Sequence, residues 1–109
     1  MRVAVMVEGD GVSARFARAP EIRVYEVEDD EVELVEAKEN PAAGLPRGAG
    51  RQIVGVLTQL DVDATVAGRY GPNALQGLKA QGIKAYIAEP GTDPEEAARK
   101  AARGELPEG

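Results

Sequence analysis

The sequence predicts an α/β protein in which one mixed β-sheet is covered by three helices. A continuous apolar run at residues 3–7 is typical of a central strand buried on both faces. Two acidic segments around Asp29-Asp30 indicate a β-hairpin. Helical and strand patterns then alternate, which places the later strands parallel to each other. The expected elements, in chain order, are strands at 3–7, 22–28 and 31–38, a helix at 51–60, a strand at 64–68, a helix starting at 72, a strand at 83–88 and a helix ending near 103.

The hairpin is expected to lie near the sheet edge, with its carboxylates in solvent keeping that edge soluble. Its apolar positions are expected to face the core: Val24, Val27, Val32, Leu34 and Val35.

Local signals justify the three helices. The first follows a loop from Asn40 to Gly50 that contains two prolines and three glycines, and its apolar residues recur at helical spacing. Pro72 suits the first turn of the second helix, and Gly82 ends it. Thr92 and Asp93 are alternative caps for the third, because each precedes a glutamate by three residues. We expect one domain over residues 1–104 and a flexible tail at 105–109.

Composition excludes several function classes. The chain has no cysteine or histidine, so it offers no disulfide, no zinc-finger site and no ordinary hydrolytic triad. Its net charge of −6 argues against a general nucleic-acid binder. The N-terminal apolar run is too short for a signal peptide or a membrane span, so we expect a cytoplasmic protein.

Basic residues gather in loops that should meet at one edge of the sheet. Residues 42–88 carry two acids against five bases, whereas residues 8–41 carry eleven acids against four bases. The loops that follow the first strand, precede the first helix and follow the fourth strand should emerge beyond the carboxyl ends of the parallel strands. Two of them lead into helix N-termini, which favour anions. The arginines of these loops are Arg15, Arg18, Arg47, Arg51 and Arg69.

Other motifs are weaker. Residues 44–52 are similar to a phosphate-binding loop but lack its Lys-Ser/Thr ending. Glu8 and Asp10 follow the first strand as two-metal nuclease carboxylates would, with Glu89 as the one further candidate. We therefore expect a binding protein rather than an enzyme.

The same loops resemble the dinitrogenase iron–molybdenum cofactor biosynthesis family, which includes NifX, NafY, the C-terminal part of many NifB proteins and the orange-protein relatives. The resemblance covers nearly the whole chain. It is carried by the order and spacing of several short stretches: Ser13 to Pro20, Glu39-Asn40-Pro41-Ala42, Gly48-Ala49-Gly50, Val66-Ala67-Gly68 with Gly71-Pro72, Gly82-Ile83-Lys84, and Gly91-Thr92 through Glu95-Glu96-Ala97.

The resemblance implies a ribonuclease-H-like three-layer fold with five strands in the order 3-2-1-4-5, of which strand two is antiparallel. It also implies a carrier of anionic metal–sulfur clusters, either iron–molybdenum cofactor precursors or molybdenum–copper–sulfide species, with a cluster-donor or cluster-acceptor protein as partner.

The chain departs from the family pattern Ser-x-His-Phe-Gly-Arg-Ala, because Arg15 replaces the histidine and Ala17 the glycine. Arg69 stands where another histidine is frequent. Imidazole ligation is therefore impossible, and an anion would be held by guanidinium and backbone donors. The implied pocket consists of Arg15, Phe16, Arg18 and Arg69, with Asn40 and Gly50 as its frame and Gly71 at the second helix entry. The alternative is a protein–protein adaptor that has lost cluster binding and uses the loop edge or the acidic hairpin.

Overall fold

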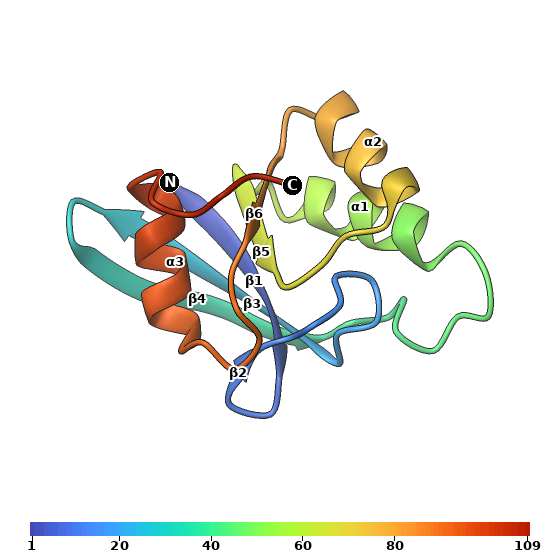
Figure 1. Ribbon diagram of the computed structural model, residues 1–109, viewed down its shortest axis with the longest axis horizontal. Helices are drawn as coiled ribbons and strands as arrows, with labels where there is room; N and C mark the ends of the chain where they lie inside the picture. The colour runs from blue at the N-terminus through green and yellow to red at the C-terminus, as the bar shows by residue number, and fades with distance from the viewer.

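The computed structural model describes residues 1–109 and contains a six-stranded mixed sheet with three helices (Figure 1). The main path of the sheet has the order β4-β3-β1-β5-β6, and β2 pairs with β1 off this path. The elements are β1 (Arg2–Glu8), β2 (Gly11–Val12), β3 (Glu21–Glu28), β4 (Glu31–Glu39), α1 (Ala49–Gln59), β5 (Ala64–Ala67), α2 (Pro72–Ala80), β6 (Lys84–Ile87) and α3 (Pro94–Ala102).

The five main strands have the expected order. β3 is antiparallel to both β1 and β4, whereas β1, β5 and β6 are mutually parallel. The short strand β2 was not expected, because residues 9–20 read as a loop. Gly9, at φ 64°, helps the chain reverse after β1, so that Val12 pairs with Val7.

Strand β1 lies at the centre of two cores. Val3, Val5 and Val7 face the core under α3, while Ala4 and Met6 face the core under α1 and α2. All five are fully buried. Figure 1 shows α3 on one side of the sheet and the pair α1 and α2 on the other. The predicted aliphatic central strand is confirmed.

Most element boundaries agree with the sequence pattern to within one or two residues. Helix α1 begins at Ala49, two residues before the expected start, because Gly48 adopts a left-handed conformation (φ 75°) immediately before it. Asp93, not Thr92, caps α3: its side chain accepts a hydrogen bond from the Glu96 N–H at 3.0 Å. Each of the three helices is too short and too polar to span a bilayer.

The expectation that Leu34 and Val35 face the core is wrong. Their exposed fractions are 49% and 40%, and every residue of β4 except Val32 is exposed. Residues of β1, β3, β5 and β6 belong to the two cores, whereas β4 contributes only the half-buried Val32.

The expectation of a free tail is also corrected. The Ile87 N–H donates to the Pro107 carbonyl at 2.8 Å, and the Gly109 N–H donates to the Ala85 carbonyl at 2.9 Å. Leu106 packs against the core under α3. Strand β6 is a sheet edge with free backbone groups, and residues 105–109 satisfy some of them.

The turn after β1 depends on a close backbone approach at Gly11. A Cβ atom at this position would lie 2.6 Å from the Cα of Gly91. We expect Gly11→Ala to lower the free energy of unfolding by about 1–3 kcal/mol through overpacking, as measured by urea denaturation. Gly44→Ala is the control, because nothing lies within 4 Å of its added Cβ. Equal stability of the two variants would contradict this close packing.

Candidate functional site

Two loops meet where β1 and β5 end. These strands are parallel neighbours, and the chain continues from β1 through β2 to β3, whereas it continues from β5 into α2. The Phe16 N–H donates to the Arg69 carbonyl, and the Gly68 N–H donates to the Ser13 carbonyl, each at 2.9 Å. A Cβ at Gly68 would lie 2.9 Å from the Ala14 carbonyl oxygen, so the approach of the two loops requires glycine. This edge is a switch point, the usual place for a ligand in such sheets.

Phe16 anchors this edge from the inside. Its side chain is 1% exposed and packs on Tyr70, with ring centroids 4.9 Å apart and an interplanar angle of 34°. The Tyr70 hydroxyl donates to the Tyr86 carbonyl at 2.8 Å. Phe16 therefore positions the loop that carries Arg15 rather than presenting a surface to a ligand.

Asn40 ties the loop after β4 to the loop before β3. Its buried Nδ2 donates to the carbonyls of Ala17 and Ala19 at 3.1 and 2.9 Å, and its Oδ1 accepts from the Ala42 N–H at 2.9 Å. Three of its four hydrogen-bonding positions are thus used internally.

Arg18 braces the same loop. It is half-buried, and its Nη1 donates to the carbonyls of Ala43, at 3.1 Å, and of Leu45. A guanidinium used in this way holds two loop carbonyls in place, so the structure puts Arg18 in the frame of the site.

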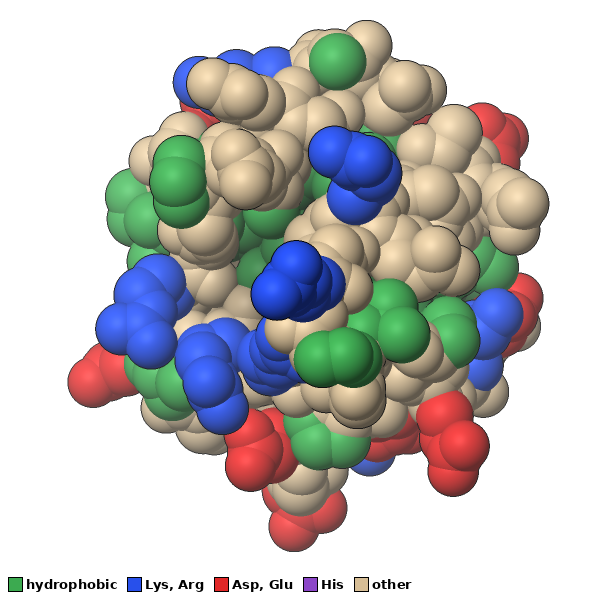
Figure 2. All heavy atoms as spheres, turned by 90° about the vertical axis from the view of Figure 1, so that its right-hand side faces the viewer, with side chains coloured by type: hydrophobic (Ala, Val, Ile, Leu, Met, Phe, Trp, Pro, Cys, Tyr) green, Lys and Arg blue, Asp and Glu red, His purple; other side chains and the backbone are tan.

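Four other arginines are free. Arg15, Arg47, Arg51 and Arg69 are exposed, and none of their side chains has a hydrogen-bond or ion-pair partner. All four lie in, or directly beside, the loops at this edge. Figure 2 shows Lys and Arg side chains gathered in the middle of this face, with carboxylates towards its margins. We call this surface the basic edge.

Two helix N-termini open onto the basic edge. Helices α1 and α2 begin after Gly48 and Gly71, and neither has a side-chain cap or an acid in its first turn. By contrast, α3 has Asp93 as its cap and Glu95 and Glu96 in its first turn. The first N–H groups of α1 and α2 thus lack a capping side chain, and both dipoles make this region positive.

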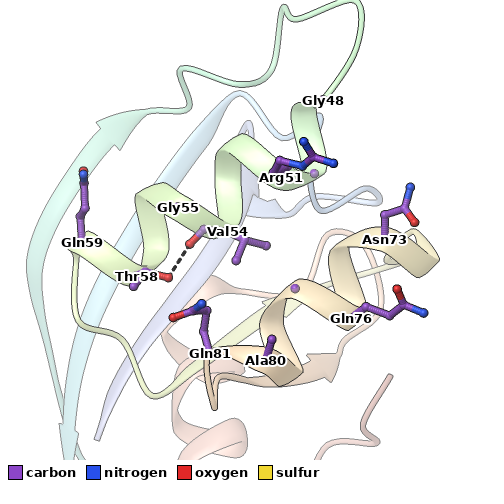
Figure 3. A pocket seen from close by; sticks show the side chains of 12 residues that line it. Gly48, Arg51, Val54, Gly55, Thr58, Gln59, Asn73, Gln76, Ala80 and Gln81 are labelled. Carbon is purple, nitrogen blue, oxygen red and sulfur yellow. Dashed lines mark hydrogen bonds between the residues drawn. The ribbon is translucent and has the colours of Figure 1, made fainter.

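A groove of about 1060 Å³ runs between α1 and α2 from this end (Figure 3). Gly50, Gly55 and Gly77 line it, and Arg51 is its one charged lining residue. Figure 3 shows Arg51 and Asn73 at the N-terminal end and Gln59 and Gln81 at the C-terminal end.

Of the seven residues predicted from sequence, only Gly50 lines this groove. None of its four carboxamides was predicted from the sequence, because these side chains carry no charge; they are Gln59, Asn73, Gln76 and Gln81. Uncharged polar residues three apart on one helix were the available signal.

The donor set of this edge fits an anion and does not fit a coordinated metal. No group of three or more His, Cys, Asp or Glu side chains could hold a metal ion, so Glu8, Asp10 and Glu89 do not form a two-metal centre. Guanidinium groups and helix N–H groups instead donate hydrogen bonds to anions.

The fold and the site together define a small α/β protein with a basic edge at its sheet switch point. The chain belongs to the dinitrogenase iron–molybdenum cofactor family, whose model matches residues 1–104. This family is linked to the biosynthesis of the iron–molybdenum cofactor.

Solved structures agree with this assignment. The apo form of the orange protein from Desulfovibrio gigas is 30% identical, with a TM-score of 0.84 over 99% of this chain and 92% of that one. A candidate NifB protein from Thermotoga is 35% identical, with a TM-score of 0.65 over 98% of this chain and 91% of that one. A relative found by sequence, an uncharacterized protein of Methanocaldococcus jannaschii, is 27% identical over 81% of this chain and 75% of its own length.

The bracing role of Asn40 can be measured. Asn40→Ala removes three hydrogen bonds and leaves buried carbonyls without partners, so we expect a loss of about 2–4 kcal/mol in the free energy of unfolding. Asn73→Ala, at an exposed position in the first turn of α2, is the control and should change it by less than about 0.5 kcal/mol. Urea denaturation of both variants compares them directly, and a tolerant Asn40→Ala would contradict the bracing role.

Tyr70 makes stability depend on alkaline pH. Burial raises the pKa of the Tyr70 phenol well above its ordinary value of 10.0. Above pH 10 the unfolded state releases this proton and the folded state keeps it, so the free energy of unfolding falls by up to about 1.4 kcal/mol per pH unit.

Tyr70→Phe removes this dependence together with the hydrogen bond to Tyr86. The wild type should therefore be more stable by about 1 kcal/mol at pH 7. The difference in the free energy of unfolding between the wild type and Tyr70→Phe should shrink as the pH rises from 10 to 11.5, as measured by denaturation at each pH. Parallel stability curves for the two proteins would contradict this origin.

Proposed function

We propose that this protein is a non-enzymatic carrier of an anionic metal–sulfur cluster, of the iron–molybdenum cofactor precursor or molybdenum–copper–sulfide type. The observation that carries the proposal is the basic edge, where four unpartnered arginines and two uncapped helix N-termini lie together. Membership of the iron–molybdenum cofactor family supports the choice of cargo.

The cluster would be held by hydrogen bonds and charge rather than by ligation. The chain has no cysteine or histidine, and its two methionines are Met1 and the buried Met6. Sulfide-rich anions accept hydrogen bonds over their whole surface, and guanidinium groups stay charged at every accessible pH. A cargo held without covalent bonds to the protein can be passed to a cluster-acceptor protein without a ligand-exchange step on this chain.

The residues divide into contacts and frame. Arg15 and Arg69 are the expected direct contacts, because the hydrogen bond from the Phe16 N–H to the Arg69 carbonyl holds their loops together. The helix entries at Gly50 and Gly71 would supply backbone donors. Phe16, Arg18 and Asn40 keep the loops in position.

Anaerobic titration with tetrathiomolybdate, with and without copper(I), tests this proposal. We expect a stoichiometric charge-transfer chromophore that survives gel filtration. Arg15→Ala and Arg69→Ala should each weaken binding by about tenfold, as expected for the loss of one charge-assisted contact.

Lys79→Ala is the matched control, because it removes one positive charge at the opposite, C-terminal end of α2. Its affinity should stay within about twofold of the wild type. An equal loss in all three variants would mean that only net charge matters. A chromophore that the column removes from the wild-type protein would favour the adaptor alternative.

A further inference from the structure

Strand β4 is an open sheet edge. It pairs with β3 alone, and its other side meets no strand of this chain. The opposite edge of the sheet, β6, is covered by the chain's own tail, which forms an antiparallel bridge between Tyr86 and Glu108. The fold thus protects one edge and leaves the longer strand uncovered.

The open edge carries the chain's exposed large hydrophobic residues. These are Leu34 and Val35, which are neighbours on β4. A bulge at this point, where Val24 pairs with Glu36 and Tyr25 with Leu34, displaces the strand locally. Solubility alone does not explain two adjacent apolar side chains on an edge strand, because edges are ordinarily blunted by polar residues.

Carboxylates surround these two residues. The register sets Glu26 opposite Glu33 and Glu28 opposite Glu31. Like charges directly opposite each other destabilise a sheet, so the free protein bears this cost. Met1 and Arg2 pair with Glu26, but the other three glutamates have no ion-pair partner.

Both ends of the edge are tied to other parts of the fold. At the hairpin tip, Arg103 pairs with the Asp30 carboxylate, its Nε at 3.1 Å, and α3 is thereby fixed to the turn. At the other end, the Asn40 N–H donates to the Pro20 carbonyl at 3.0 Å. A strand held in its bound shape loses little entropy when another strand adds to it.

A second copy of this chain does not fit the open edge. Strand β4 contains four glutamates and one lysine, and a β4–β4 pairing would double that negative charge within one ladder. Charge complementarity instead requires a cationic occupant with apolar residues for Leu34 and Val35.

We propose that β4 docks an extended, lysine- or arginine-rich segment of a partner protein by strand addition. Backbone hydrogen bonds of the open edge would provide the ladder, the glutamates would select basic side chains, and Leu34 and Val35 would contact the apolar ones. This inference is independent of cluster binding at the basic edge.

The test uses a fluorescent nine-residue peptide of alternating lysine and valine and follows its anisotropy on addition of the full chain. We expect binding that weakens as salt is raised. Glu33→Lys combined with Glu36→Lys should reduce the affinity at least about tenfold. Asp10→Lys combined with Glu89→Lys changes the net charge equally at exposed positions outside β4 and its hairpin turn, and should alter the affinity by less than about threefold.

Two further measurements distinguish strand addition from non-specific electrostatic attraction of the basic peptide, and both use the wild-type protein. Hydrogen exchange should slow at residues 31–39 when the peptide is bound. A peptide N-methylated at every second residue on its pairing edge should lose binding, whereas one methylated on the other edge should keep it. Equal affinities of the two charge-reversal variants, unchanged exchange in β4, or equal binding of both methylated peptides would each overturn the proposal.

Discussion

The burial of β1 on both faces is the constraint on which the rest of the structure depends. Its five residues from Val3 to Val7 have no exposed surface, so helices must cover both sides of the sheet at this strand. Parallel pairing of β1 with β5 then brings the ends of both strands to one edge. There the loop after β1 and the loop after β5 meet through backbone hydrogen bonds and form part of the basic edge.

Four backbone carbonyls of the loops are satisfied by side chains rather than by backbone N–H groups of regular structure. Asn40 and Arg18 together bind four carbonyls from the segments before β3 and after β4. Buried polar groups need such partners, because each unsatisfied carbonyl would cost about 1–3 kcal/mol. The arginines of the edge therefore differ in role. The Arg18 side chain binds carbonyls of the protein itself, whereas the side chains of Arg15 and Arg69 have no partner within the protein.

The molecule separates its charges by element. The basic edge has free arginines and uncapped helices, whereas the hairpin of β3 and β4 has glutamates facing glutamates across the strands. The net charge of −6 therefore describes neither surface. A cluster anion and a basic partner segment would be attracted to different ends of the same protein, and this separation allows both to bind at once.

The sequence by itself determined the element order, the aliphatic central strand and the antiparallel hairpin. Apolar runs, helix stops and turn residues act through local interactions, so the elements that they define can be predicted without knowledge of tertiary contacts. It also placed the arginines in the loops at the sheet edge, because strand direction fixes where such loops emerge. The exposure of Leu34 and Val35, the docking of the tail on β6 and the groove between α1 and α2 were decided only by the tertiary structure. Each of these features depends on contacts between segments that are far apart in the sequence, such as how far a helix extends over the sheet or which backbone groups the tail meets. Arg15 and Arg18 look alike in sequence, and only the carbonyls of Ala43 and Leu45, folded against Arg18 from a distant loop, distinguish them.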